Sequence, residues 1–369
     1  MAVASVATAV EGRRVAATHV ERRTLRPIVA WAGFGILVAA LELYVFAAWI
    51  ASGPKEITAG RAQLPGYIKA FDTGQQIVYP TVFVGVFAWF VVRPLIRRQP
   101  LGLDGLLAIV CASLYWQDPI VNYFRLNVTY NTGFINRGSW VDHIPGWSSP
   151  NGAVAEPFLC AAPVYLIWFL PCLILLNKLM AVSQRRWPRM GKLGLMSICF
   201  VATCVIDTVC ECLWLRTGLY SYTGVIHHWT VFEGHYYQFP IYEAPCIGFL
   251  FTCFASVRYF RNDRGETMVD RGIDRIGLGP RRRTALRLFA LIGVFNLVFF
   301  VFDGIYAWTA MYDRSWPKDV LDRPYLLDGL CGPGTDYACP GPNVPVPLRG
   351  SVHVRPDGTL STALPAAHG

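Results

Sequence analysis

Long apolar runs alternate with shorter polar connectors along most of this chain. An α-helix rises about 1.5 Å per residue, so roughly 20 apolar residues cross the hydrocarbon layer of a bilayer, which is about 30 Å thick. Seven stretches have the pattern of such a helix: 28–50, 76–92, 103–124, 158–177, 193–215, 239–256 and 288–311. We therefore predict an all-α, polytopic transmembrane helical bundle of about seven spans.

The segments on either side of this bundle, 28–311, have a different pattern. An N-terminal arm, 1–27, is basic, and we expect it in the cytoplasm. A tail, 312–369, is rich in Pro and Gly from residue 317 onward and has no helical period, so we expect it to be irregular. Seven spans do not divide into two equal halves, which argues against the inverted-repeat plan of many transporters.

Charge is scarce and unevenly placed. Charged residues make up 15% of the 369 residues and hydrophobic residues 54%, which excludes intrinsic disorder and argues against an ordinary soluble enzyme. About two thirds of the Lys and Arg residues lie in the arm and in the second, fourth and sixth connectors, so we place these in the cytoplasm and the tail outside. Orientation thereby explains the net charge of +9, and we expect a cytoplasmic-membrane location and no nucleic-acid partner.

Acidic residues inside the apolar spans are the main functional signal. A carboxylate at membrane depth costs several kcal/mol and is a functional candidate by default. Counted from the expected outer ends, at about 1.5 Å per residue, six such acids lie roughly 6–12 Å deep in one half of the bilayer: Glu42, Asp118, Asp207, Glu211, Glu243 and Asp303. Pairing with Tyr, Asn or Trp could explain any one of them, but packing gives no reason for a shared layer.

Five of these acids are predicted to be catalytic: Asp118, Asp207, Glu211, Glu243 and Asp303. Asp207 and Glu211 are four residues apart, so their carboxyls lie on one helix face, about 5–6 Å apart, and favour sharing one proton. Pro119 removes a backbone donor beside Asp118, and a loosened helix at membrane depth is tolerated where it lines a cavity. The pattern favours acid–base chemistry, although a proton relay or ion passage would use the same layer.

The third and fifth connectors are long and aromatic enough to cover the outer mouth of the bundle. Many of these rings could instead form an interfacial belt. An aromatic cover above a layer of carboxyls suits a large, mostly apolar substrate. The predicted substrate-binding residues are Glu42, Trp116, Asn122, Trp140, Trp147, His235 and Tyr236, with Trp140 and Tyr236 closing the pocket.

Cysteine, histidine and lysine positions narrow the chemistry. Cys331 and Cys339 lie in the tail assigned outside, where an oxidising compartment allows a disulfide, with two free thiols as the alternative. The chain has no Cys-x-x-Cys or His-x-x-x-His pair, so we expect no metal site and interpret the outer-loop histidines as surface residues. No lysine lies well inside a span, which excludes a retinal Schiff base.

Several short motifs resemble a known family. They are Tyr115-Trp116-Gln117-Asp118-Pro119 with Asn122-Tyr123, Tyr130-Asn131, Gly138-Ser139-Trp140, Ile144-Pro145-Gly146-Trp147, Ser149-Pro150-Asn151-Gly152 and Glu156-Pro157, followed by Asp207, Glu211, Gly218-Leu219-Tyr220 and Glu243. Together they resemble the spirocyclase AveC family of actinobacterial membrane proteins, over about residues 28–345. The resemblance implies polyketide tailoring, in which a dihydroxyketone becomes the spiroketal of an avermectin-type macrolide with an accompanying dehydration.

Spiroketal closure fits the acid layer because it needs a proton donor, a base and a counter-charge, but no redox cofactor. We predict a cofactor-independent cyclase or dehydratase that acts on a polyketide or macrolide in the lipid bilayer, with the oligomeric state left open. A proton-coupled transporter of a lipid or polyketide is the main alternative. A lipid or terpenoid cyclase that uses a diphosphate is a further one, but the fifth connector offers only Arg216 to hold phosphates.

Overall fold

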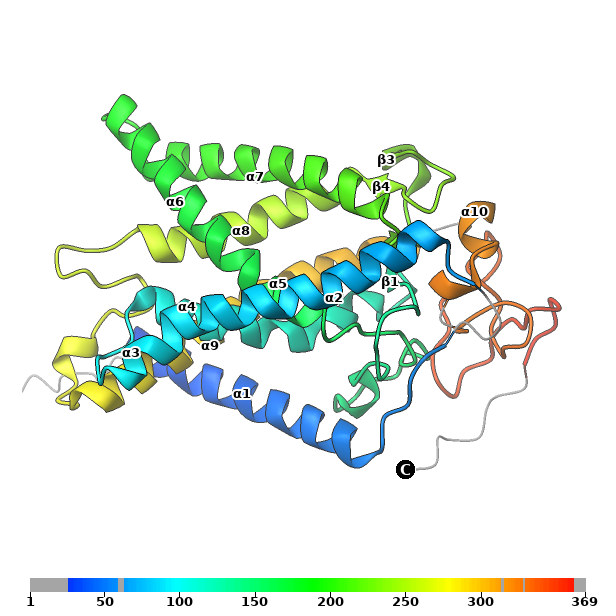
Figure 1. Cartoon of the computed structure of the whole chain (residues 1–369), viewed down its shortest axis with the longest axis horizontal. Coiled ribbons are helices and arrows are strands. Elements are labelled where there is room, and N and C mark those ends of the chain that lie inside the picture. Colours follow the sequence, from blue (N-terminus) through cyan, green and yellow to red (C-terminus); the bar gives the residue numbers. More distant parts are fainter. Residues whose placement is uncertain (1–25, 59–62, 313–314, 328, 362–369) are drawn as a thin grey trace, which may run out of the picture.

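The computed structural model describes residues 26–58, 63–312, 315–327 and 329–361. The expected N-terminal arm, 1–27, therefore lies almost entirely outside the described residues. Long helices run side by side along the molecule, and irregular segments gather at one end (Figure 1). The all-α membrane fold predicted from the apolar runs is confirmed, because the described chain is mostly helical and has several helices suited to a bilayer.

Five helical segments of the described chain are long and apolar enough to cross a membrane. They are α1 (Pro27–Ala51); α2 (Gly66–Phe87) with the π-helical turn η1 (Ala88–Val92) and α3 (Arg93–Ile96); α5 (Ala161–Ile167) with α6 (Phe169–Arg186); α7 (Lys192–Leu215); and α9 (Pro280–Thr309) with η6 (Ala310–Tyr312). Several helices extend beyond the predicted apolar runs because polar residues continue the backbone hydrogen bonding. For example, α2 begins at Gly66, directly after Pro65, and not at residue 76.

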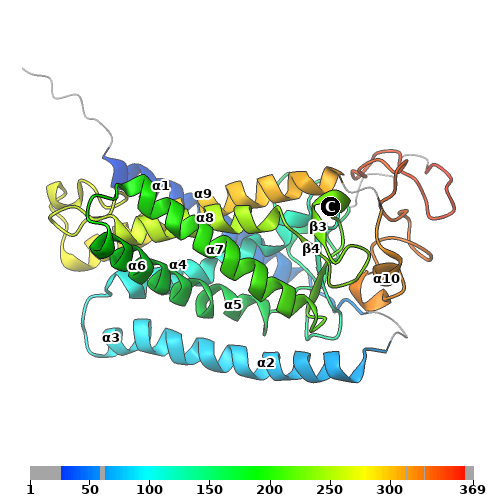
Figure 2. The same ribbon diagram turned by 90° about the horizontal axis from the view of Figure 1, so that it is seen from above.

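The other two predicted spans, 103–124 and 239–256, are shorter α-helices. α4 (Leu103–Ser113) has 11 residues and then tightens into the 3-10 helix η2 (Leu114–Asn122), which contains Pro119. α8 (Glu243–Tyr259) follows strand β4 (Phe239–Pro240), so the start of that predicted span is extended. Both segments nevertheless run through the bundle beside the longer helices (Figure 2).

α1 and α9 are packed backbone to backbone. A Cβ atom at Gly35 would lie 1.8 Å from the carbonyl oxygen of Phe289, and one at Gly293 would lie 2.5 Å from that of Trp31. Only glycine permits this approach, as at the small-residue contacts of membrane helices. The contact fixes α9, which carries Asp303, against α1.

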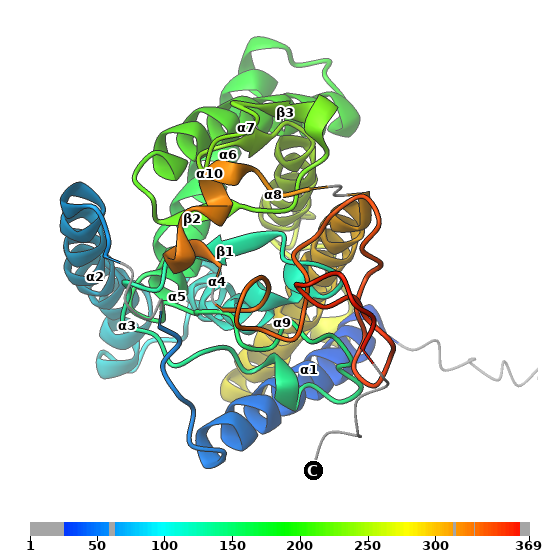
Figure 3. The same cartoon turned by 90° about the vertical axis from the view of Figure 1, so that its right-hand side faces the viewer.

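Two short antiparallel ribbons lie in the third and fifth connectors. β1 (Val128–Tyr130), from the third connector, pairs with β2 (Tyr220–Tyr222), from the fifth, and Tyr130 lies opposite Tyr220. β3 (Thr230–Val231) pairs with β4. Seen end-on, the strands lie over the helix ends (Figure 3). The two connectors predicted to cover the bundle therefore meet in one β-ribbon.

The tail forms an outer layer on these connectors (Figure 1). It contains α10 (Lys318–Leu321) and the 3-10 turn η7 (Pro324–Leu326), and three further 3-10 turns lie in the connectors: η3 (Val141–His143), η4 (His227–Trp229) and η5 (Ile273–Arg275). Trp316 and Val320 of the tail belong to one buried apolar cluster with Ile68 of α2. A disulfide joins Cys331 to Cys339.

Candidate active site

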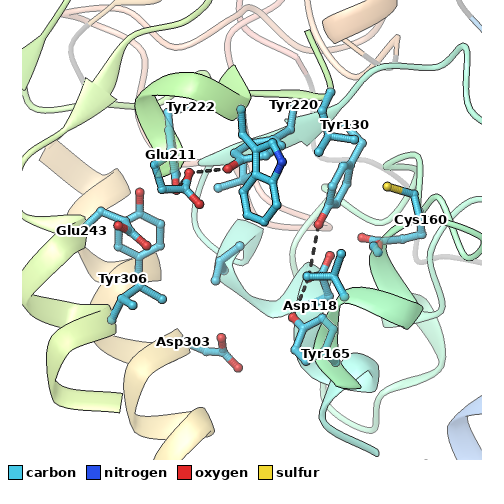
Figure 4. A pocket seen from close by; sticks show the side chains of 18 of the residues that line it. Asp118, Tyr130, Cys160, Tyr165, Glu211, Tyr220, Tyr222, Glu243, Asp303 and Tyr306 are labelled. Atoms are coloured by element: carbon cyan, nitrogen blue, oxygen red, sulfur yellow. Dashed lines mark hydrogen bonds between the residues drawn. The ribbon is translucent and has the colours of Figure 1, made fainter. Parts of the chain in front are cut away.

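An internal cavity of about 180 Å³ lies beneath the β1–β2 ribbon, among η2, α5, α7, α8 and α9 (Figure 4). Its polar lining consists mainly of carboxyls and phenols, and most of the remaining lining is apolar. The carboxyls belong to Asp118, Glu156, Glu211, Glu243 and Asp303, and the phenols to Tyr79, Tyr130, Tyr165, Tyr220, Tyr222 and Tyr306. The structure thus brings four of the five predicted catalytic acids to one space.

The 3-10 helix η2 is held in place by one amide on α9. The side-chain oxygen of Asn296 accepts hydrogen bonds from the indole N–H of Trp116 and the amide of Gln117, each at 2.8 Å. All three side chains are buried. Because these bonds fix two consecutive residues, the next one, Asp118, is held at the cavity wall.

Asp118 is surrounded by donors. Its Oδ1 accepts hydrogen bonds from the phenols of Tyr165, at 2.6 Å, and Tyr130, at 3.4 Å. Burial, followed by the nearby Asp118 charge, raises the pKa of Tyr130 well above its ordinary value, so this phenol stays a neutral donor. The Asp118 carboxyl is also hydrogen-bonded to that of Glu156. A hydrogen bond between two carboxyl groups requires a proton on one of them, so this pair holds a shared proton.

Glu211 lies on α7 across the cavity. Its Oε2 accepts hydrogen bonds from the phenols of Tyr220 and Tyr222, the second at 3.0 Å. Burial, followed by the Glu211 charge, raises the pKa of both phenols well above their ordinary values. The alternation along β2 explains the arrangement, because residues two apart on a strand point to the same side.

Asp207 has a different partner from the one predicted. Its carboxyl is hydrogen-bonded to that of Glu243, the first residue of α8, and not to Glu211 on its own helix. The spacing rule correctly put Asp207 and Glu211 close together, but it could not anticipate the neighbouring helix or the β2 phenols. Glu243 lines the cavity whereas Asp207 does not, so Asp207 lies behind it.

Asp303 differs from the other lining acids. It is fully buried on α9, and neither of its carboxyl oxygens has a hydrogen-bond partner among the described residues. The phenol oxygen of Tyr306, one helical turn further on, is equally without a partner there. Both side chains border the cavity (Figure 4), so polar groups of a bound molecule can pair with them.

Most of the predicted substrate-binding residues lie elsewhere. Asn122 borders the cavity, but its side chain accepts from the backbone N–H groups of Asn127 and Val128 and donates to the Val128 carbonyl. Glu42 is half-buried on α1 and does not line the cavity. Trp116 is taken up by its bond to Asn296.

Trp140 and Trp147, two of the predicted substrate-binding residues, do not line the cavity and make contacts within the protein. Trp140 is buried, donates to the Trp116 carbonyl oxygen at 2.6 Å, and has its ring 4.9 Å from that of Phe46. Trp147 packs edge-on against Tyr123, with ring centres 4.8 Å apart.

The two predicted residues of the fifth connector lie in the outer layer. Tyr236 contacts the phenol of Tyr67 at 3.0 Å, and His235 stacks on Tyr237. Neither lines the cavity. The cover is made instead by Tyr130, Tyr220 and Tyr222, because the ribbon and not the loop tips lies over the cavity.

Glu156 was not among the predicted site residues, although Glu156-Pro157 is one of the motifs that resemble the family. It lies in the third connector, and only acids inside apolar spans were considered as candidates. In the structure it is 2% exposed and borders the cavity. The signal available was its position: an acid followed by Pro157, two residues before the fourth predicted span.

The cavity is acidic without a balancing base. No Lys, Arg or His is among the described residues that line it. Within residues 26–58, 63–312, 315–327 and 329–361, no group of three or more His, Cys, Asp or Glu side chains is arranged to hold a metal ion. The lining therefore favours neutral or cationic groups over phosphates.

Comparison with known families agrees with the motifs. The family model described as "Spirocyclase AveC-like" matches residues 96–325, more than half of the chain. The matched region contains every acid that lines the cavity. No curated protein and no solved structure matches the chain. On the strength of the family match, this chain belongs to the AveC-like spirocyclases.

Proposed function

We propose that this protein is a membrane-embedded acid–base enzyme of polyketide tailoring, which dehydrates and cyclises a dihydroxyketone macrolide precursor to an avermectin-like spiroketal. The observation that carries the proposal is the cavity lining, in which five carboxyls and several phenols surround one space. Such a lining stabilises a cationic, oxocarbenium-like transition state, which basic side chains would repel. The family match supports the same class of reaction.

The proposed cyclisation loses one water and changes no oxidation state. The first hydroxyl adds to the ketone carbon, so a C–O bond forms, the C=O π bond breaks, and the hydroxyl proton passes to the former carbonyl oxygen to give a hemiketal. The hemiketal C–OH bond then breaks as its oxygen takes a proton from the enzyme, and the departing water leaves an oxocarbenium ion. The second hydroxyl attacks this carbon and gives its proton to a carboxylate. Each turnover therefore needs one donor and one acceptor.

The Asp118–Glu156 pair is the proposed donor. Two hydrogen-bonded carboxyls hold a proton between them, and that proton can pass to the departing hydroxyl. Tyr165 and Tyr130 donate to Asp118 and stabilise the negative charge that remains after transfer.

Glu211 is the proposed acceptor. Two neutral phenols, Tyr220 and Tyr222, donate to one of its oxygens, and such bonds favour the charged carboxylate. In the dehydration, Glu211 removes a proton from carbon while the Asp118–Glu156 pair protonates the departing hydroxyl. A C=C bond forms and water leaves, so the same two groups serve both steps.

Asp303 and Glu243 complete the proposed site. The unpartnered oxygens of Asp303 can accept hydrogen bonds from the substrate hydroxyls and face the developing cation. Glu243 presents one oxygen without a hydrogen-bond partner and shares its other side with Asp207. These groups supply counter-charge close to where the oxocarbenium ion forms.

The test is conversion of a linear dihydroxyketone by protein purified into nanodiscs, with the spiroketal measured by mass spectrometry. Asp118→Asn and Glu211→Gln should each lower the rate about a thousandfold, as expected for loss of a general acid or base. The matched controls are Asp263→Asn and Glu56→Gln, which alter exposed acids that do not line the cavity. Normal conversion by both cavity variants would refute the proposal, and movement of unchanged substrate across vesicles would favour the transporter alternative.

A further inference from the structure

A second hollow lies on the flank of the bundle, between the first half of α2 and the end of α7. It has a volume of about 580 Å³ and is bordered by α2 residues from Tyr67 to Tyr79 and by Trp214 and Thr217. α2 packs against α5 and stands apart from α7 in two perpendicular views (Figures 2 and 3). The groove therefore lies where neighbouring helices are not in close contact.

The groove and the cavity share a wall. Tyr79 of α2 and Trp214 of α7 border both spaces. Their side chains are hydrogen-bonded to each other, and the indole N–H is the donor because its nitrogen cannot accept. One pair of rings, each on a different helix, therefore separates the two spaces.

The groove is suited to hydrocarbon. Phe71 and Val78 on α2 border it and are exposed. The Thr217 hydroxyl donates to the Trp214 carbonyl oxygen at 2.7 Å, and the Tyr67 phenol contacts that of Tyr236. With these hydroxyls engaged inside the protein, the walls offer a ligand mainly apolar contact.

The small volume of the cavity bears on how one substrate would occupy both the cavity and the groove. The cavity, at about 180 Å³, is smaller than the roughly 300–1,000 Å³ of common ligand pockets, so it holds a segment of a macrolide precursor and not the whole. We infer that the groove binds an apolar arm of the substrate while the dihydroxyketone segment occupies the cavity, and that the substrate passes between α2 and α7 when Tyr79 and Trp214 separate. The inference rests on the proposed function for the identity of the reacting segment.

Gly74 allows the groove to be filled without disturbing the cavity. It borders the groove, and a Cβ atom added there meets nothing within 4 Å. Gly85 lies on the same helix, has equally open surroundings and borders neither space. Gly74→Leu and Gly85→Leu therefore form a matched pair, and both replace glycine by a better helix former.

The experiment compares two δ,δ′-dihydroxyketones, one with a long alkyl arm and one without it. Gly74→Leu should lower kcat/KM for the long-armed compound about tenfold, because several apolar contacts are lost, and change that of the short one less than about twofold. Gly85→Leu should match the unaltered protein with both. Equal values for Gly74→Leu and Gly85→Leu on the long-armed compound would overturn the inference.

A binding measurement separates this inference from the proposed function. A long-armed dihydroxyketone with a diazirine in its alkyl arm should label α2 and α7 peptides that border the groove, and Gly74→Leu should reduce that labelling about tenfold relative to Gly85→Leu. Labelling with this pattern supports the groove even if no spiroketal forms. Labelling that misses these peptides overturns the groove even if the cyclisation proceeds.

Discussion

The two walls of the cavity use the same parts in different ways. On one wall, Asp118 accepts from two phenols and is hydrogen-bonded to a second carboxyl, that of Glu156. On the other, Glu211 accepts from two phenols, and among the described residues no second carboxyl is hydrogen-bonded to it. The β1–β2 ribbon joins the walls, since the rings of Tyr130 and Tyr220 lie 5.9 Å apart.

We interpret this difference as opposite proton-transfer roles for the two walls, one donating a proton and the other accepting one. A carboxyl that shares a proton with another carboxyl can release that proton, whereas a carboxyl stabilised by neutral phenols can receive one. The local group is the same in both walls, and the additional neighbour determines its role. We therefore expect the walls to respond differently when each is altered.

The largest expected effect distinguishes the two walls by how a variant in each responds to a change in the leaving group of the substrate. Asp118→Asn should lose about a thousandfold in rate on the hydroxyketone, but about tenfold or less on a hemiketal ester, whose carboxylate leaves without a proton. Glu211→Gln should lose about a thousandfold on both compounds, because the attacking hydroxyl still needs a base. Initial rates on the two compounds measure this. Equal rescue of both variants by the ester would show that the walls are equivalent.

Asp303 belongs to neither wall and should show opposite effects on activity and stability. Asp303→Leu should lower kcat about ten- to a hundredfold through loss of counter-charge. The same change removes a buried carboxyl whose oxygens have no partner in the described structure, so the free energy of unfolding should rise by about 1 kcal/mol. Thermal unfolding in detergent checks the second effect. A lower Tm would indicate that Asp303 has a packing role instead.

Removing a phenol hydroxyl should lower kcat by different factors on the two walls. Tyr220→Phe removes a donor to the carboxylate that is proposed to carry charge and should lower kcat about tenfold. Tyr130→Phe removes a longer bond, 3.4 Å, to a carboxyl that already has two other partners, and should lower kcat about two- to threefold. The reverse order would contradict the assignment of Glu211 as the charged group.

The smallest expected effect concerns alkaline pH. The pKa values of Tyr130, Tyr220 and Tyr222 are raised by burial, whereas an unfolded phenol titrates near about 10. Their contribution to stability is therefore complete below about pH 10 and is lost as pH rises through the higher folded values. The Tm measured in detergent should fall as pH rises above about 10, and fall less in Tyr222→Phe. An equal fall in both proteins would exclude this phenol as a cause.

The sequence was sufficient to predict features that depend on one segment alone, namely the helix formed by each apolar run and the free-energy cost of an acid within it. Apolar runs of membrane length specify the helices, and the expense of carboxyls within them singled out Asp118, Glu211, Glu243 and Asp303, which the structure places around one cavity. These inferences need only the properties of each segment. They do not require knowledge of which segments contact each other in the fold.

Features that depend on two distant segments were not predictable. Glu156 reaches Asp118 only because the third connector folds back on η2, and Asp207 meets Glu243 only because α8 begins beside α7. Trp140 is of a residue type common in binding sites, but in the structure it is buried and packs against Phe46. Its position depends on which backbone carbonyl oxygen its indole N–H reaches. Residue type alone does not specify that contact.

The glycine contact between α1 and α9 also has a mechanical consequence. Because Gly35 and Gly293 bring the two backbones together, we expect the two helices to move together and Asp303 to keep its position relative to both. Any expansion needed to admit a bulky molecule must then be absorbed by the opposite flank, at α2. We therefore expect α1 and α9 to stay in place while α2 moves, so that the counter-charge proposed for Asp303 keeps its position during substrate entry.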